Sequence, residues 1–375
     1  MPDNNRIFYA CQAVYVDGTY LQNVQAVGID YSADATAIPD IGRSQQQRSF
    51  YSKPEITISI QREVNTTATP FYTPAAVTNY ADAYILKQGN LGTAGWDTRP
   101  AVPTPTDPDD PPARDADVPL KEYKIEVAYG SDDLSGRIES QTLNYCLLTD
   151  VSYSISADGK MTEDLSFVTR SIVKSGSAAA PIASPLSGTI FKRQHLDVEN
   201  DDFILPSEVK EVVDLDEVAR SVQSISISAA FEYSELTDVG KWRGSNQTWN
   251  PTEQNKWKYI TTPIGVTCEI TAVVRKSMVA EKNILITDTN FMGTFPTPNR
   301  EIKVVMGPTP NLSDPTAPTW FVIDLGKKNY LTGISYSGGD TGGGNVEATF
   351  SYANTNNDFV PYKGTIVTLA QVTKY

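Results

Sequence analysis

The most constraining feature of this sequence is that it contains one pattern twice. The segment NVQAVGIDY matches SVQSISISA, which aligns Val24 with Val222 at an offset of 222 − 24 = 198. Further along the chain, DIGR at residues 40–43 and DVGK at residues 238–241 preserve the same offset. An offset that survives across separate segments indicates a duplicated structural unit.

The ends of the two copies also correspond. LTDVSYS from Leu148 matches LTGISYS from Leu331, at an offset of 331 − 148 = 183. With a one-residue gap, TEDLSFV from Thr162 then aligns with VEATFSY from Val346. EYKIEVAYG and EIKVVMGPT precede these motifs, each followed by a second hydrophobic strand, so the order of parts is preserved.

The repeat divides the 375-residue chain into two domains and a linker. We predict a first domain over residues 1–172, a linker over 173–186 that is rich in small residues, and a second domain with a C-terminal tail over 187–375. The segment 99–119 is rich in proline and aspartate. Because proline lacks an N–H donor, we expect an exposed loop there, which copy two lacks.

Alternation of apolar and polar residues predicts a mainly β fold. In the segment ITISIQ from Ile56, isoleucine alternates with polar residues, and Asp158-Gly159 is suited to a tight hairpin turn between two alternating runs. Helical patterns are sparse. We expect short helices near residues 77–89 and 207–219, the second with a serine N-cap.

Charge and cysteine content exclude several classes of protein. The balance of 31 basic and 45 acidic residues gives a net charge of −14, which argues against a surface that grips nucleic acid. Cys11, Cys146 and Cys268 lie far apart and form no CxxC pair, so we expect neither a disulfide framework nor a zinc site. The sequence shows no signal peptide and no apolar run long enough to span a membrane, so we expect a soluble protein without membrane contact.

The sequence offers no catalytic constellation. His195 is the only histidine and has no recognisable nucleophile partner, and the acidic runs at Asp107 and Asp197 lack the spacing of a calcium loop. GGDTGGGN lacks the Lys-Ser/Thr of a phosphate-binding loop, so we interpret it as a hairpin tip. We therefore expect a protein that is not an enzyme and has no catalytic residues, cofactor or metal.

These motifs, in their order, resemble the major tail tube proteins of tailed bacteriophages. The resemblance rests on the VQAVGI strand, the DIGRSQ segment, the PEITISI strand, a short helix, and the LTDVSYS hairpin with TEDLSFV. It covers nearly the whole chain and extends to the tube protein of type VI secretion. It implies two tandem tail-tube-like domains, each a β-sandwich or barrel with a short helix and long loops.

The resemblance also implies an assembly. In that family six domains form a ring whose inner strands join into one barrel, and rings stack into a tube. Three duplicated chains would supply six domains, so we expect a homotrimeric, pseudo-hexameric ring that lets DNA pass without specific binding. The implied partners are other copies of the chain and tail proteins such as a sheath, tape measure, baseplate or terminator. The implied location is the virion tail, assembled in the cytoplasm of the bacterial host.

We also predict residues at the interface between subunits. Trp242, Trp249 and Trp257 lie along one long segment of copy two, where they could stack on a sugar or on a partner protein. We favour contact between rings, and we assign Tyr51 and Arg43 to the same interface. Two alternatives remain open: a ring that initiates or terminates the tube, and a carbohydrate-binding, receptor-binding tail protein.

Overall fold

The computed structural model describes the strands of both halves of the chain. The described residues are 12–33, 35–38, 48–51, 55–64, 122–130, 137–156, 159–176, 190, 192, 196, 204–206, 209, 221–235, 258–260, 265–274, 300–306, 320–326, 329–338, 346–354 and 360–364. They form almost exclusively antiparallel strands, so the predicted mainly β fold class is confirmed. No described helix is long and apolar enough to cross a membrane.

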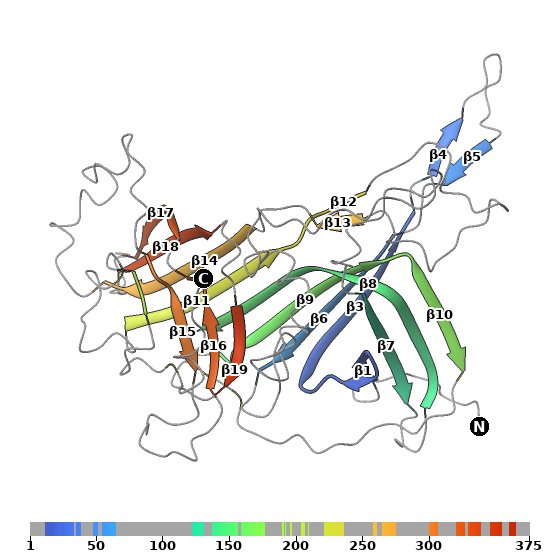
Figure 1. The fold of residues 1–375 in the computed structure, drawn as a ribbon, viewed down its shortest axis with the longest axis horizontal. Helices are drawn as coiled ribbons and strands as arrows, with labels where there is room; N and C mark the ends of the chain where they lie inside the picture. The colour runs from blue at the N-terminus through green and yellow to red at the C-terminus, as the bar shows by residue number, and fades with distance from the viewer. Residues whose placement is uncertain are drawn as a thin grey trace, which may run out of the picture.

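A continuous antiparallel sheet, here called the central sheet, runs through both halves (Figure 1). Its first part has the order β3-β6-β9-β8 and its second part the order β11-β14-β18-β17, and β8 pairs with β11 where the two parts meet. The strands are β3 (Val24–Ser32), β6 (Glu55–Glu63), β8 (Arg137–Ser156), β9 (Thr162–Thr169), β11 (Val222–Ala230), β14 (Gly265–Val273), β17 (Tyr330–Ser337) and β18 (Glu347–Asn354).

The two parts of the central sheet share an irregularity in their first strand. The register of β3 against β6 shifts between Val24 and Ala26, and the register of β11 against β14 shifts between Val222 and Ser224. Both shifts sit at the offset 222 − 24 = 198. β-Bulges re-aim a strand locally, so their equivalent placement shows that the duplication extends to backbone geometry.

The strands that end each part share a second irregularity. The register shifts between Leu148 and Asp150 in β8, and between Leu331 and Gly333 in β17, again at the offset 331 − 148 = 183. A side-chain bond recurs beside each shift. Thr149 Oγ1 donates to the Ser166 carbonyl at 3.1 Å, and Thr332 Oγ1 donates to the Ser351 carbonyl at 2.9 Å.

The register corrects one alignment from the sequence. Ser154 faces Thr162 in the first part, whereas its counterpart Ser337 faces Glu347 in the second. Thr162 therefore corresponds to Glu347, and the predicted match to Val346 is wrong by one residue. The reason is the two-residue period of a strand: a one-residue slip would move every side chain of β18 to the opposite face.

Smaller sheets lie beside the central sheet, one in each half. In the first half, β2 (Thr19–Tyr20), β1 (Gln12–Val16), β7 (Tyr123–Gly130) and β10 (Ser171–Gly176) assemble on the N-terminal portion of β8. In the second half, β15 (Lys303–Met306), β16 (Trp320–Asp324) and β19 (Val360–Gly364) form a three-stranded sheet. The 20 residues of β8 run unbroken through both sheets, whereas β16 and β17 are separate strands.

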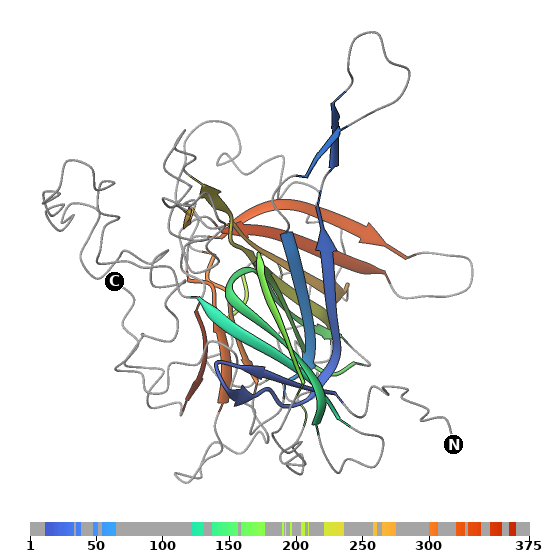
Figure 2. The ribbon, with the colours of Figure 1, turned by 90° about the vertical axis from the view of Figure 1, so that its right-hand side faces the viewer.

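Each half also carries a two-stranded hairpin between its first two central strands. β4 (Ala35–Ile38) pairs with β5 (Arg48–Tyr51), and β12 (Tyr233–Glu235) pairs with β13 (Lys258–Ile260). The β4–β5 hairpin projects beyond the sheets, as its blue strands show (Figures 1 and 2).

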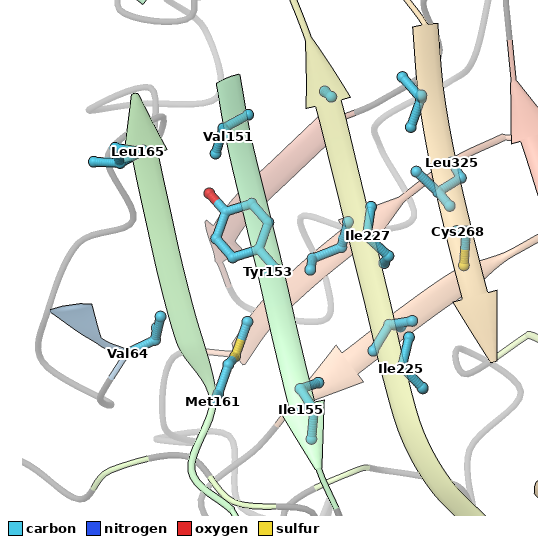
Figure 3. Close-up of a cluster of buried hydrophobic side chains, with 14 of the residues drawn as sticks. Val64, Val151, Tyr153, Ile155, Met161, Leu165, Ile225, Ile227, Cys268 and Leu325 are labelled. Carbon is cyan, nitrogen blue, oxygen red and sulfur yellow. The ribbon is translucent and has the colours of Figure 1, made fainter. Parts of the chain in front are cut away.

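The core lies between the central sheet and the smaller sheets. Side chains from β9, β8, β11 and β14 converge on one side of the central sheet (Figure 3). Tyr123 of β7 contacts Phe167 of β9, with ring centroids 5.7 Å apart, and Tyr153 of β8 contacts Phe321 of β16 at 5.5 Å. The core therefore crosses the boundary between the two halves, because Tyr153 belongs to the first and Phe321 to the second.

Several predicted segments lie outside the described residues. They include the helix expected near 77–89, the proline-rich loop 99–119 and, apart from Val209, the helix expected near 207–219. β10 includes residues 173–176, the first part of the range assigned to the linker, and the rest of that range is also outside the described residues. The division into domains stays a prediction.

Candidate functional site

The central sheet has one buried face and one polar, solvent-accessible face. β6 alternates between exposed polar residues and buried isoleucines, and β9, β14 and β18 follow the same period. Gly28 and Ser59 lie on the same face. A Cβ atom added to Gly28 would lie 2.7 Å from Ser59 Oγ. We call this surface the polar face. By strand register it contains Ala26, Gly28, Asp30, Ser32, Glu55, Thr57, Ser59, Gln61, Glu63, Leu147, Asp150, Ser152, Ser154, Ser156, Thr162, Asp164, Ser166, Val168, Ser224, Ser226, Ser228, Ala230, Gly265, Thr267, Glu269, Thr271, Val273, Tyr330, Gly333, Ser335, Ser337, Glu347, Thr349, Ser351 and Ala353.

The charged residues at the strand positions of the polar face are all acidic. Its strand positions include no lysine, arginine or histidine, and the arginine of β6, Arg62, points to the buried face, where it pairs with Glu163. Lys160, in the turn before β9, reaches Glu63 at 2.5 Å. The remaining polar positions carry mostly serine and threonine. The acidic positions are Asp30, Glu55, Glu63, Asp150, Asp164, Glu269 and Glu347.

Polar contacts cross the strands of this face. Thr271 and Thr349 hydroxyls lie 3.0 Å apart, and Ser228 Oγ donates to Asp150 Oδ2 at 3.5 Å across the β8–β11 pairing. Partial burial raises the pKa of Asp150 above its usual range, the Ser228 bond opposes that rise, and Asp164 adds to it. These groups form a surface rich in hydroxyl groups and carboxylates, and its described strand positions contain no lysine or arginine to hold a phosphate.

The central sheet ends in two edge strands, β3 and β17. Among the described strands, β3 pairs only with β6 and β17 pairs only with β18. Large apolar side chains are exposed along both: Tyr31 on β3 is 56% exposed, and Tyr336 on β17 is 47% exposed. An edge strand that displays backbone groups and apolar side chains is a template for strand addition.

The β8–β11 pairing within the chain joins strands that are equivalent, by the repeat, to the two edge strands. β8 corresponds to β17 and β11 corresponds to β3, by the offsets given above. At this internal junction Tyr153 faces Ile227, and each is 1% exposed. Equivalent strands are therefore paired and buried inside the chain, as β8 and β11, and exposed at the two sheet edges, as β17 and β3.

The predicted interface residues belong to the two equivalent hairpins by sequence position. Tyr51 ends β5, where its backbone faces Ala35 of β4. Arg43 lies outside the described residues, in the segment between β4 and β5. The three tryptophans at positions 242, 249 and 257 also lie outside them, between β12 and β13. Their role at an interface stays a prediction.

Sequence reasoning did not single out β3 and β17 as edge strands. The signal that could have found them is the repeat itself, since the offsets define which strands occupy equivalent positions. The order of strands across a sheet, however, is set by contacts between residues far apart in sequence.

Both cysteines among the described residues are buried. Burial raises the pKa of the Cys146 thiol to about 12 and also raises that of Cys268, which disfavours the nucleophilic thiolate at neutral pH. Within the described ranges, no group of three or more His, Cys, Asp or Glu residues could hold a metal ion. His195 lies outside the described residues.

No model of a known protein family matches this sequence, and no curated protein matches it. The chain is similar to a solved structure described as the anti-feeding prophage cap, the AFP tube terminating cap, with 8% sequence identity and a TM-score of 0.30. It is also similar to the PVC sheath-tube complex of an extracellular contractile injection system in the extended state, with 10% identity and a TM-score of 0.30. Each match covers 47% of this chain and 95% of the other. TM-scores at this level do not establish a shared fold.

Proposed function

We propose that this chain is a structural subunit of a phage tail tube, whose polar face lines a lumen. The observation that carries the proposal is the central sheet: two equivalent parts, one buried face, and one hydroxyl-rich face whose charged residues are all acidic. A sheet with such a face and two edge strands is suited to closing into a ring with copies of itself.

The duplication favours a ring of three chains. Each chain contributes two equivalent sets of central strands, so three chains supply the six units of a pseudo-hexameric ring. Closing the sheet removes both edge strands, which would otherwise invite uncontrolled strand pairing. Joining two units in one chain also makes one of every two contacts intramolecular, which raises its effective concentration.

The chemistry of the polar face suits the passage of DNA. A lumen rich in lysine and arginine would release counterions on meeting phosphates and would hold the DNA. Hydroxyl groups with scattered carboxylates repel the polyanion and solvate it without binding it. In this role the protein is not an enzyme and needs no cofactor.

A subunit of a phage tail tube would also contact other copies of its own ring and other tail proteins. Stacked rings would contact each other through the two hairpins, β4–β5, which projects beyond the sheets (Figure 1), and β12–β13. They would also meet a sheath, tape measure, baseplate or terminator. The protein would reside in the virion after assembly in the host cytoplasm.

Electron microscopy of the purified protein tests the proposal. Negatively stained samples over a range of concentrations should contain rings of three chains and stacks of rings, and mass photometry should give a trimeric mass. A protein that stays monomeric at high concentration would contradict the proposal. The copy number per virion would separate a tube subunit, present in many stacked rings, from an initiator or terminator, present in one.

A further inference from the structure

We infer that the edge strand β17 of one chain pairs with the edge strand β3 of a second copy, in the register of the internal β8–β11 junction. This inference rests on the proposed ring and adds to it the residues that meet. Tyr336 lies opposite Ile29, and Ile334 lies opposite Tyr31.

The register follows from two correspondences within the chain. β17 is β8 displaced by 331 − 148 = 183 residues, and β3 is β11 displaced by 222 − 24 = 198 residues. At the internal junction Tyr153 faces Ile227. Carried to the edges, Tyr153 becomes residue 153 + 183 = 336 and Ile227 becomes residue 227 − 198 = 29.

The residues at the edges fit this register. The pair Tyr336 and Ile29 has the same side-chain types as the internal pair Tyr153 and Ile227. At the next pair on the same face, Ile334 and Tyr31 correspond to Val151 and Ala229.

Exposure changes in the direction that a missing neighbour would produce. Val151 and Ala229 are both 0% exposed at the internal junction, whereas Tyr31 is 56% exposed at its edge. Tyr336, at 47%, contrasts in the same way with Tyr153, at 1%. Pairing of β17 with β3 would cover these apolar side chains, because burial of apolar surface is favourable.

The internal β8–β11 junction and the proposed β17–β3 junction carry their carboxylate on opposite strands. Internally, β8 carries Asp150, and β11 supplies Ser228 as its hydrogen-bond donor. At the edges the carboxylate is on the other strand, because Gly333 stands where β8 has Asp150, and Asp30 stands where β11 has Ser228. Each junction therefore carries one carboxylate at this point, and repulsion between two is avoided.

Cysteine cross-linking tests the register in the full chain, with Cys11 replaced by serine. Residues directly opposite in antiparallel strands have Cα atoms about 4.5–5.5 Å apart, within the range for a disulfide. Mild oxidation of Tyr336→Cys/Ile29→Cys should therefore join chains into covalent dimers and closed trimers that dithiothreitol reverses. Tyr336→Cys/Tyr31→Cys is the matched control, because diagonal neighbours lie about 7–8 Å apart and should cross-link poorly.

The outcomes separate the register from the ring itself. Rings in which the diagonal pair cross-links better than the predicted pair would overturn the register and leave the proposed function standing. Absence of oligomers from the wild-type protein would contradict both. If the cysteine variants fail to fold, amide hydrogen exchange of wild-type rings gives the answer. Amides of β3 and β17 should exchange at least about tenfold more slowly in rings than in monomers, and unchanged exchange would refute edge pairing.

Discussion

Arg62 and Glu163 form an ion pair on the buried face of the first half, and Tyr153 donates its hydroxyl to Glu163 Oε1 at 2.8 Å. The register places Ala272 and Ala348 at the equivalent positions of the second half, where both are buried. The same sheet geometry thus accommodates either a buried ion pair or two small apolar residues. Burial of two charges costs free energy that their attraction only partly offsets, so the pair itself adds little to the free energy of unfolding.

Loss of one partner of this pair should destabilise the protein strongly. Glu163→Ala leaves Arg62 buried without its carboxylate, and we expect the free energy of unfolding to fall by about 3–5 kcal/mol. Arg62→Ala/Glu163→Ala, which copies the second half, should lose less than the sum of the two single variants. Urea denaturation of all three variants measures this coupling, and strictly additive losses would contradict it.

Asp150 predicts a pH dependence. Because burial raises the pKa of its carboxyl in the folded state, folding favours the protonated form, and stability declines as pH rises from the ordinary aspartate pKa of about 3.9 toward the folded pKa. Asp150→Asn removes this effect. The variant should gain stability relative to the wild type at pH 7 and should show no such gain at about pH 2.5, where the carboxyl is protonated in both states. Thermal unfolding at both pH values checks the sign, and a gain confined to acidic pH would refute it.

At the scale of strands, the internal junction unites the two halves. β8 and β11 pair from Ser156↔Ser224 to Asp150↔Ala230, and their buried side chains join one core. The two halves should therefore unfold in a single transition. The reason is that the sheet itself crosses from one half to the other.

Truncation of a junction side chain should weaken both halves together. Ile227→Ala removes buried methyl and methylene groups beside Tyr153, and we expect a loss of about 2–5 kcal/mol in the free energy of unfolding. Ser226→Ala, on the exposed polar face of the same strand, is the control and should change stability by less than about 0.5 kcal/mol. Chemical denaturation followed by fluorescence measures both. Two separate transitions in the wild type would show that the junction does not couple the halves.

The elements themselves were predictable from local patterns, and their neighbours were not. Alternation over residues 56–61 predicted β6 and its two faces, and the offsets 198 and 183 located strands that the register then matched. The alignment of β18 was wrong by one residue because a hairpin tip tolerates extra residues whereas a strand face does not. Pairing of β8 with β11, and with it the continuous polar face, depends on contacts across the repeat boundary, which no local pattern encodes.

At the scale of the whole molecule, the charge of the polar face should control how an assembled ring treats DNA. Ser154 and Ser226 face each other on this surface at the internal junction. We expect Ser154→Lys/Ser226→Lys rings to bind DNA with an affinity that falls steeply with salt, because each phosphate contact releases counterions. Ser154→Gln/Ser226→Gln rings are the control and should bind as weakly as the wild type. Fluorescence anisotropy over a salt series measures the slope, and strong binding by wild-type rings would contradict a lumen that lets DNA slide.

The order of the strands along the chain has a consequence for synthesis. β3, β6, β8 and β9 all leave the ribosome before β11, and together they complete the first part of the sheet. β8 then offers its outer margin to β11 while the second half is still being translated. The first half of each nascent chain can therefore act as a template on which the second half adds its strands.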